Sequence, residues 1–485
     1  MNRKLFLGGA ALCAMFTLSS CDELAKIEDE TKDDQNQEIP VTPVDPSEKD
    51  EPTAELKPSE QKVKLQEVGQ EIMDMCPASE FEPLAAIAES FANSVYASED
   101  YDWGTVEEWF ETELDDAYSS EEKVTVSDGT RTTEWIADAL ILMSDHTGLF
   151  TLTEDGVVIS DYAGGTKAVC TLNGKTYEAE ITSEGKVTNA IYVYTEEDAY
   201  TNSGYYDENG NWIETEVYKD KEIYTVGVPE KINVSVSENG SPLLTLTAEF
   251  TPSFSKEGIN LTTDSFATKI TAAINGYERI IEKAAYNGET GKTEYSETFK
   301  KDGIVIYSAK VSGDAKIEEV VEKWEDSYSS ETYTTIKVHK AQNIVASVDI
   351  LGQIQVYGKC SDGMEAYEEL NAVWEAYDAG SESEAQRHMN NFNTKFDLNV
   401  YYDGGSNKQA GIEFEIISYP ADYDRNGDGL INNDDCYYDI APVIVFNDGS
   451  RYKVEEYFTE DSFSSIIESF EAFCNSFAEV IGFEE

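Results

Sequence analysis

The chain has 485 residues, of which 40% are hydrophobic and 11% aromatic, so it can bury a sizeable core and is not disordered throughout. Its 97 acidic residues against 35 basic ones give a formal net charge of -62, which argues against nucleic acid and anionic membrane surfaces as partners. The length corresponds to roughly three domains of about 150 residues each.

Residues 1–20 predict a lipoprotein signal peptide. Asn2–Lys4 makes a positive start, and Leu5–Leu18 is apolar but too short to span a bilayer stably. The stretch LSSC that ends at Cys21 resembles a bacterial lipobox, which implies cleavage before Cys21 and acylation of that residue. Because each buried methylene contributes about 0.8 kcal/mol, several acyl chains anchor a protein firmly to a membrane. The alternative is an ordinary secretory signal followed by a chance cysteine.

Residues 21–60 predict an acidic, proline-rich and disordered tether, because the segment has almost no large apolar residues to offset its ordering entropy. An acidic stretch after a lipidated cysteine resembles the export signals of surface-exposed Bacteroidota lipoproteins. That resemblance implies lipid anchoring in a bacterial outer membrane with the protein facing the cell exterior. Retention in the periplasm is the alternative.

Hydrophobic periodicity predicts a helical segment over residues 61–120 and an antiparallel β region over 121–360. Asn173-Gly174 lies between two alternating segments, which is the strongest short signal for a hairpin. Asn275-Gly276 indicates a second hairpin, although its flanks also fit a helix.

Residues 361–485 predict an α+β region that closes on a helix. Ser381–Glu384 has the spacing of a capping box, and the helix that follows aligns Ala385, Met389 and Phe392 on one face. An apolar stripe from Phe463 to Ile481 predicts the last helix. We therefore expect an α+β fold with N-terminal helices, an extended antiparallel β-sheet, and C-terminal helices packed on the sheet.

The stretch DRNGDGLINNDD, residues 424–435, matches a calcium loop position by position. Alternate positions of such a loop point inward together and supply the hard oxygen ligands that Ca²⁺ prefers. The expected ligands are Asp424, Asn426, Asp428, the backbone carbonyl of Leu430, Asn432 and Asp435. The alternative is a metal-free polar turn, since Asp, Asn and Gly favour turns in any case.

This loop resembles a single dockerin or EF-hand repeat over its twelve residues. A dockerin has two such repeats, each followed by a helix, whereas here one repeat is followed by the strand-like sequence CYYDIAPVIVF. Cohesin binding is therefore not implied, and we expect calcium to stabilise a connection between strands.

A tyrosine-rich segment follows the first predicted hairpin and contains the candidate ligand-binding aromatic residues Tyr200, Tyr205, Tyr206 and Trp212. Exposed aromatic rings beside carboxylates can stack on the sugar rings of a glycan or contact a protein ligand. The alternative is that these rings form cross-strand packing pairs on a sheet.

Few features favour an enzyme. The three histidines are far apart in sequence, and no HExxH, GxSxG or phosphate-loop motif occurs. A hydrolase that uses a carboxylate pair, such as a glycosidase, stays open because it needs only two suitably placed acids. The five cysteines after Cys21 are scattered and predict buried thiols: Cys76, Cys170, Cys360, Cys436 and Cys474.

The pattern of lipobox, acidic tether, helices and tyrosine-rich sheet resembles the large surface lipoproteins of gut-type Bacteroidota, a resemblance that implies an address but no activity. The sequence favours a membrane-anchored, calcium-binding lipoprotein with a binding or scaffolding role for a glycan or a protein. The alternatives are a secreted carboxylate-pair hydrolase and a purely structural lipoprotein.

Overall fold

The computed structural model describes residues 42–50, 52–81, 118–127, 130–142, 147–153, 156–172, 174–206, 209–325, 329–420, 436–454 and 457. It is mostly β-sheet with few helices, which confirms the α+β class in its broad form. The chain divides into two compact units. Among the described residues, no helix combines the length and the hydropathy that crossing a membrane requires.

Unit 1 comprises residues 1–35, 83–293 and 315–339. Its strands are β1 (Tyr118–Ser127), β2 (Thr130–Leu142), β3 (Gly148–Thr153), β4 (Gly156–Ser160), β5 (Thr166–Leu172), β6 (Lys175–Tyr206), β7 (Trp212–Glu238), β8 (Ser241–Ser253), β9 (Ser265–Ile274) and β10 (Tyr277–Asn287). The long strands β12 (Ile304–Glu325) and β13 (Ser329–Ile350) contribute residues to both units.

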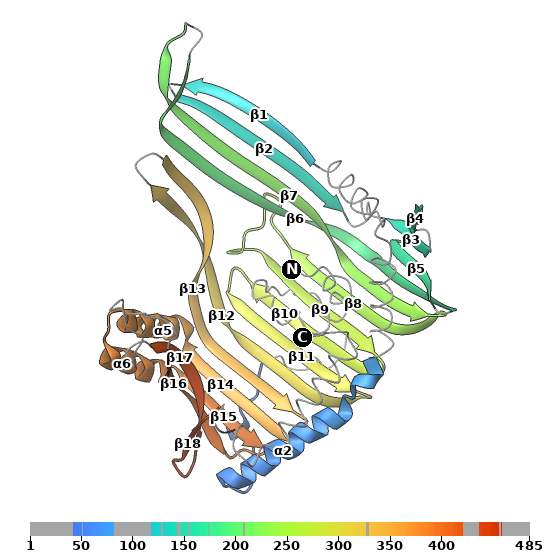
Figure 1. Cartoon of the computed structure of the whole chain (residues 1–485), viewed down its shortest axis with the longest axis vertical. Coiled ribbons are helices and arrows are strands. Elements are labelled where there is room, and N and C mark those ends of the chain that lie inside the picture. The colour runs from blue at the N-terminus through green and yellow to red at the C-terminus, as the bar shows by residue number, and fades with distance from the viewer. Residues whose placement is uncertain are drawn as a thin grey trace. The chain divides into compact units, whose positions relative to one another are not determined.

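Two very long strands, β6 and β7, form the antiparallel ribbon at the centre of unit 1 (Figure 1). Strand β8 continues the sheet beyond β7, followed by β9 and β10. Two pairings differ from the predicted antiparallel region, because β2 runs parallel to β7 and β3 runs parallel to β5. The sheet is therefore mixed, and local turn signals contain no information on such long-range pairings.

The predicted hairpins are confirmed. Strands β5 and β6 pair from Leu172 and Lys175 across the turn at Asn173-Gly174. The segment around Asn275-Gly276 is a hairpin rather than a helix: β9 and β10 pair from Ile274 and Tyr277. Asn275 and Gly276 both have positive φ, as the type I′ turn of a two-residue hairpin requires.

Unit 2 comprises residues 36–82, 294–314 and 340–485. Its helices are η2 (Pro46–Glu48), α2 (Pro58–Met75), η3 (Ala78–Phe81), α5 (Gly363–Asp378) and α6 (Glu382–Asn393). Its strands are β14 (Ile354–Asp362), β15 (Phe396–Tyr402), β16 (Ala410–Pro420), β17 (Cys436–Phe446) and β18 (Arg451–Lys453), with most of β11 (Lys292–Lys301). Strands β13 to β18 pair antiparallel in sequence order.

The core of unit 2 contains the helical face that the sequence predicts. Ala385 and Met389 of α6 are fully buried, and Phe392 is nearly so. The ring of Phe392 lies edge-on to Phe414 of β16, with 5.5 Å between the ring centroids. Asp362 caps α5 by accepting hydrogen bonds from two backbone N–H groups of its first turn. Ser381, the expected cap of α6, makes no such side-chain bond.

The end of the predicted tether, residues 52–60, is part of unit 2 and includes the start of a helix. Helix α2 begins at Pro58, and residues 52–57 run beside Gln409. The amide of Gln409 accepts a hydrogen bond from Leu56 N at 2.8 Å and donates one to Ala54 O at 3.1 Å. Composition favours disorder here, but these bonds to a residue about 350 positions away supply the missing stabilisation.

Candidate functional site

The structure places only part of the predicted site. The calcium loop, residues 424–435, and the lipidated Cys21 lie outside the described residues. Among the described residues, no three His, Cys, Asp or Glu side chains come together in a way that could hold a metal ion. Tyr200 lies in β6 opposite Glu216, but its side chain is outside the described set. Tyr205 and Tyr206 lie at the end of β6, and Trp212 is the first residue of β7.

Tyr206 and Trp212 form a cross-strand pair beside the β6–β7 turn. Their rings meet edge to face with 5.1 Å between centroids, a favourable aromatic geometry. They are nevertheless 70% and 47% exposed, so the pair packs internally and still presents ring surface to solvent. Tyr205 lies within 5.6 Å of the Arg131 guanidinium, measured to the ring centroid.

The strand register defines a larger aromatic surface on β1, β2, β6 and β7. Because side chains alternate between the two sides of a sheet, directly paired residues share a side. Five aromatic residues of these strands lie on one side, which we call the aromatic face: Trp135, Tyr192, Tyr194, Tyr218 and Tyr224. Tyr192 is 54% exposed and Trp135 is 40% exposed, so the face is open to solvent.

The opposite face has a different composition. Within β1, β2, residues 215–229 of β7 and residues 187–197 of β6, none of the described aromatic side chains lies on it, and its exposed apolar surface includes Leu140, which is 46% exposed. It also carries direct cross-strand ion pairs. Lys123 lies 3.3 Å from Glu134, and Lys219 contacts Glu197. This composition is the usual one for a solvated sheet surface.

A polar cluster around the buried Glu216 lies at one end of the aromatic face. The Arg131 Nε atom is 3.7 Å from Glu216, whose carboxylate is largely buried. Burial, and a hydrogen bond to Glu216, raise the pKa of the Tyr218 hydroxyl, which therefore stays protonated at neutral pH. The Arg131 side chain thus lies near the Glu216 carboxylate of β7 and near the Tyr205 ring of β6.

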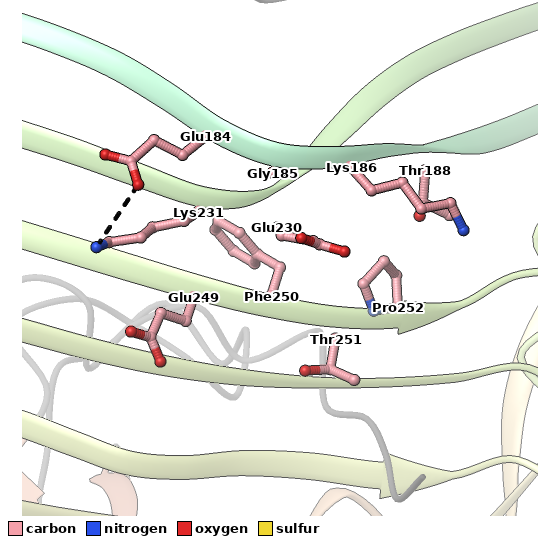
Figure 2. Close-up of a pocket in the computed structure, with 10 residues that line it drawn as sticks. All are labelled: Glu184, Gly185, Lys186, Thr188, Glu230, Lys231, Glu249, Phe250, Thr251 and Pro252. Atoms are coloured by element: carbon pink, nitrogen blue, oxygen red, sulfur yellow. Dashed lines mark ion pairs between the residues drawn. The ribbon is translucent and has the colours of Figure 1, made fainter. Parts of the chain in front are cut away.

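A hollow of about 490 Å³ lies where β6 bulges away from β7 (Figure 2). Lys231 of β7 is directly opposite both Glu184 of β6 and Glu249 of β8. The Lys231 Nζ atom is 4.0 Å from the Glu184 carboxylate, which also accepts a 2.9 Å hydrogen bond from Asn233. Phe250 and Pro252 form the apolar part of the lining, and Glu230 and Lys186 complete the charged part.

Gly185 makes this bulge possible. Its φ is +85°, and a Cβ atom on it would lie 2.4 Å from a carboxylate oxygen of Glu230. The hollow is therefore built into the backbone. Its charged lining alternates in sign, since one lysine lies between two glutamates, and this offers a polar recess rather than an isolated carboxylate pair.

The histidines and thiols of the described residues have structural partners. His388 Nδ1 lies 2.7 Å from Glu369, and this hydrogen bond lowers the pKa of that carboxyl. Cys76, Cys170 and Cys360 are buried and form no disulfide bond, as the sequence predicts. Burial raises the pKa of the Cys170 and Cys360 thiols, which disfavours the reactive thiolate.

The sequence pointed to the tyrosines of this region but missed Trp135, Arg131 and Glu122. These three lie on β1 and β2, and only the parallel pairing of β2 with β7 brings them to the tyrosines.

Comparison of the chain with protein-family models, with curated proteins and with solved structures gives no match.

Proposed function

We infer that the protein is a lipid-anchored binding protein whose aromatic face and neighbouring Tyr206–Trp212 pair contact a ligand outside the cell. The observation that carries this proposal is the exposure of aromatic rings on one side only of a four-stranded sheet. Scattered single apolar residues on a surface need no explanation, but a contiguous exposed patch marks an interaction site. Tyr and Trp suit this role because they give rigid contact area at a low cost in side-chain entropy.

The proposed membrane localisation depends on Cys21, the expected lipid attachment site in the outer membrane. A fatty acid supplied to growing cells should label the wild-type protein and leave Cys21→Ala unlabelled. Equal labelling of the two proteins would remove the anchor from the proposal. Ser20→Ala, which keeps a small residue beside the cysteine, is the matched control and should still be labelled.

Calcium is the proposed cofactor, held by the 424–435 loop between two strands. Strands β16 and β17 flank that loop and pair from Pro420 to Cys436, so the loop closes a strand connection. Exterior sites of this class bind Ca²⁺ at about 0.1 to 1 mM, and bound calcium stabilises the folded state by mass action. Millimolar Ca²⁺ should raise the melting temperature of the wild-type protein but not that of the double variant Asp424→Ala, Asp428→Ala.

We also extend the proposal to the architecture, with the helices of the C-terminal region packing on the sheet. The contacts of α6 with β16 and of α5 with β17 support it. Phe392 lies against Phe414, and Tyr377 stacks on Tyr438 with 3.9 Å between ring centroids. The helix expected over residues 459–481 would extend the same layer.

The binding role itself can be tested on the full chain with arrays of neutral oligosaccharides and of cell-surface proteins. The double variant Trp135→Ala, Tyr192→Ala should lose affinity for a ligand that wild type binds, by about tenfold or more. Leu140→Ala is the control, because this similarly exposed residue lies on the opposite face. If no ligand binds wild type more tightly than it binds the double variant, the binding role is refuted.

The hollow beside Gly185 motivates the second candidate, a carboxylate-pair hydrolase. Glu184, Glu230 and Glu249 line it, and glycosidases place two carboxyl groups about 5 to 10 Å apart across a substrate. Lys231 lies between Glu184 and Glu249 in the strand register and pairs with Glu184, so a cation separates these two carboxylates. Glycosidase activity that is lost in both Glu184→Gln and Glu249→Gln would reverse the order of the two candidates.

A further inference from the structure

We propose that the ligand of the aromatic face is a cationic segment of another protein, rich in Lys and Arg, which binds across the four strands. This inference rests on the proposed binding function and names its partner by chemistry. Three features of the molecule support it: the unequal charge of the two faces, the position of Arg131 beside a carboxylate and an aromatic ring, and the spacing of the acidic and aromatic residues along one row.

Charge is divided unequally between the two faces of β1, β2, residues 215–229 of β7 and residues 187–197 of β6. The described side chains of the aromatic face include five carboxylates and one cation: Glu122, Glu196, Glu216, Asp220, Glu222 and Arg131. Those of the opposite face include four carboxylates and three lysines: Glu121, Glu134, Asp138, Glu197, Lys123, Lys219 and Lys221. The aromatic rings therefore lie in the more negative environment.

Exposed aromatic rings among carboxylates suit Lys and Arg side chains. A cation is attracted to the face of an aromatic ring, and a carboxylate adds a charge-assisted hydrogen bond. The protein already holds one cation beside such groups, since the Arg131 Nε atom forms a 3.7 Å ion pair with Glu216, without a hydrogen bond, and the Arg131 guanidinium lies 5.6 Å from the centroid of the Tyr205 ring. An external Lys or Arg can use the same two kinds of contact at Trp135.

The strand register places these groups in one row across the sheet. Glu122 is opposite Trp135, Trp135 is opposite Asp220, and Asp220 is opposite Glu196. Because neighbouring strands are about 4.8 Å apart, the row is about 14 Å long. Alternate residues of an extended peptide are about 7 Å apart, so two or three basic side chains of one segment reach the row.

A flat row of this length favours a polypeptide over a small cation, which would need an enclosing pocket. The net charge of -62 favours the encounter with a basic partner and slows that with an acidic one. A neutral glycan would gain ring stacking from Trp135 and Tyr192 but nothing from the carboxylate excess. Charge complementarity therefore selects the basic segment.

The test measures binding of a fluorescent oligolysine peptide to the full chain at about 0.15 M salt, where charges beyond about 8 Å are screened. Glu122→Gln and Glu121→Gln make a matched pair: the residues are adjacent, both are exposed, and both substitutions remove one negative charge. We expect Glu122→Gln to weaken binding several-fold and Glu121→Gln to leave it nearly unchanged. Equal effects would mean that the peptide responds only to net charge and would overturn the proposal.

Trp135→Ala and Leu140→Ala form the second pair, with no change of charge. Loss of the Trp135 ring should weaken peptide binding about 2- to 30-fold, the range that a cation–π contact contributes, whereas Leu140→Ala should not. If Trp135→Ala fails to fold, as judged by its melting curve, the Glu122/Glu121 pair still decides the question.

A neutral oligosaccharide series on the same variants separates the two proposals. Glycan binding that depends on Trp135, together with peptide binding that does not, would keep the binding function and overturn the basic segment. If neither probe depends on Trp135 or Glu122, both proposals fail. Peptide binding that depends on both residues supports the inference.

Discussion

The two units use tyrosine in opposite ways. In unit 2, Tyr357, Tyr401 and Tyr402 are almost completely buried. Tyr402 packs with Val68 of α2 and Ile354 of β14, and burial raises the pKa of its hydroxyl. On the aromatic face of unit 1, Tyr192 of β6 and Tyr218 of β7 lie exposed.

A covering element, rather than residue type, therefore decides whether a tyrosine-rich strand is core or surface. Helix α2 covers the Tyr402 side of β14 and β15 with Leu65, Val68 and Ile72. Tyr357 and Tyr401 lie on the other side, near Asp45 of the N-terminal segment. Burial under such an element stabilises the fold by about 25 cal/mol per Å² of apolar surface, and exposed rings lack this stabilisation. Exposure on one face alone therefore points to a surface kept open for a ligand. Four substitutions sharpen this comparison.

The largest effect is expected for Met389→Ala in unit 2. Met389 of helix α6 is fully buried in a cluster with Val373, Ala385 and Phe392, so the substitution leaves a cavity and should lower the free energy of unfolding by about 2 to 5 kcal/mol. Chemical denaturation measures this change. A loss below about 1 kcal/mol would mean that this core is not packed as described.

Gln409→Ala tests the ordered end of the tether. It removes a fully buried amide and leaves Leu56 N–H and Ala54 C=O without their bonds, which should cost about 1 to 3 kcal/mol. Limited proteolysis should then cleave residues 42–57 faster than in wild type. Asn447→Ala, which removes an exposed bond to Lys408 O, is the control and should leave cleavage unchanged.

The Glu369–His388 bond predicts a pH dependence. The pKa of Glu369 is lowered in the folded state, so its contribution is complete above its unfolded value near 4.5 and is lost as the pH falls through the folded value. Because the pair is partly exposed, the contribution should be under about 1 kcal/mol. Glu369→Gln should therefore destabilise the protein at pH 7, and the difference from wild type should shrink as the pH falls below about 4.5. Glu368→Gln on the same helix is the control.

The smallest effect is expected for Tyr192→Ala. More than half of this side chain is exposed, so the free energy of unfolding should change by no more than about 0.5 kcal/mol. Denaturation run beside Met389→Ala gives the contrast directly. A loss of 2 kcal/mol or more would mean that Tyr192 is packed in a core and would contradict an aromatic face that is open to solvent.

Local sequence signals predicted much of the fold. Asn275-Gly276 specified a turn, because two positive φ values favour those residues, and the helical spacing of Ala385 and Met389 specified a buried face. The parallel pairing of β2 with β7 was beyond prediction, because residues such as Trp135 and Asp220 are distant in sequence and no turn joins them. The calcium loop and the lipid anchor remain predictions from the sequence.

Hydroxyl-radical footprinting of the full chain, with and without the oligolysine peptide, tests the central claim most directly. Trp135 and Tyr192 should oxidise rapidly in the free protein and become protected when the peptide binds, while Tyr357 and Tyr402 stay slow in both states. Slow oxidation of Trp135 and Tyr192 in the free protein, or rapid oxidation that the peptide leaves unchanged, would contradict an open face that binds a basic segment.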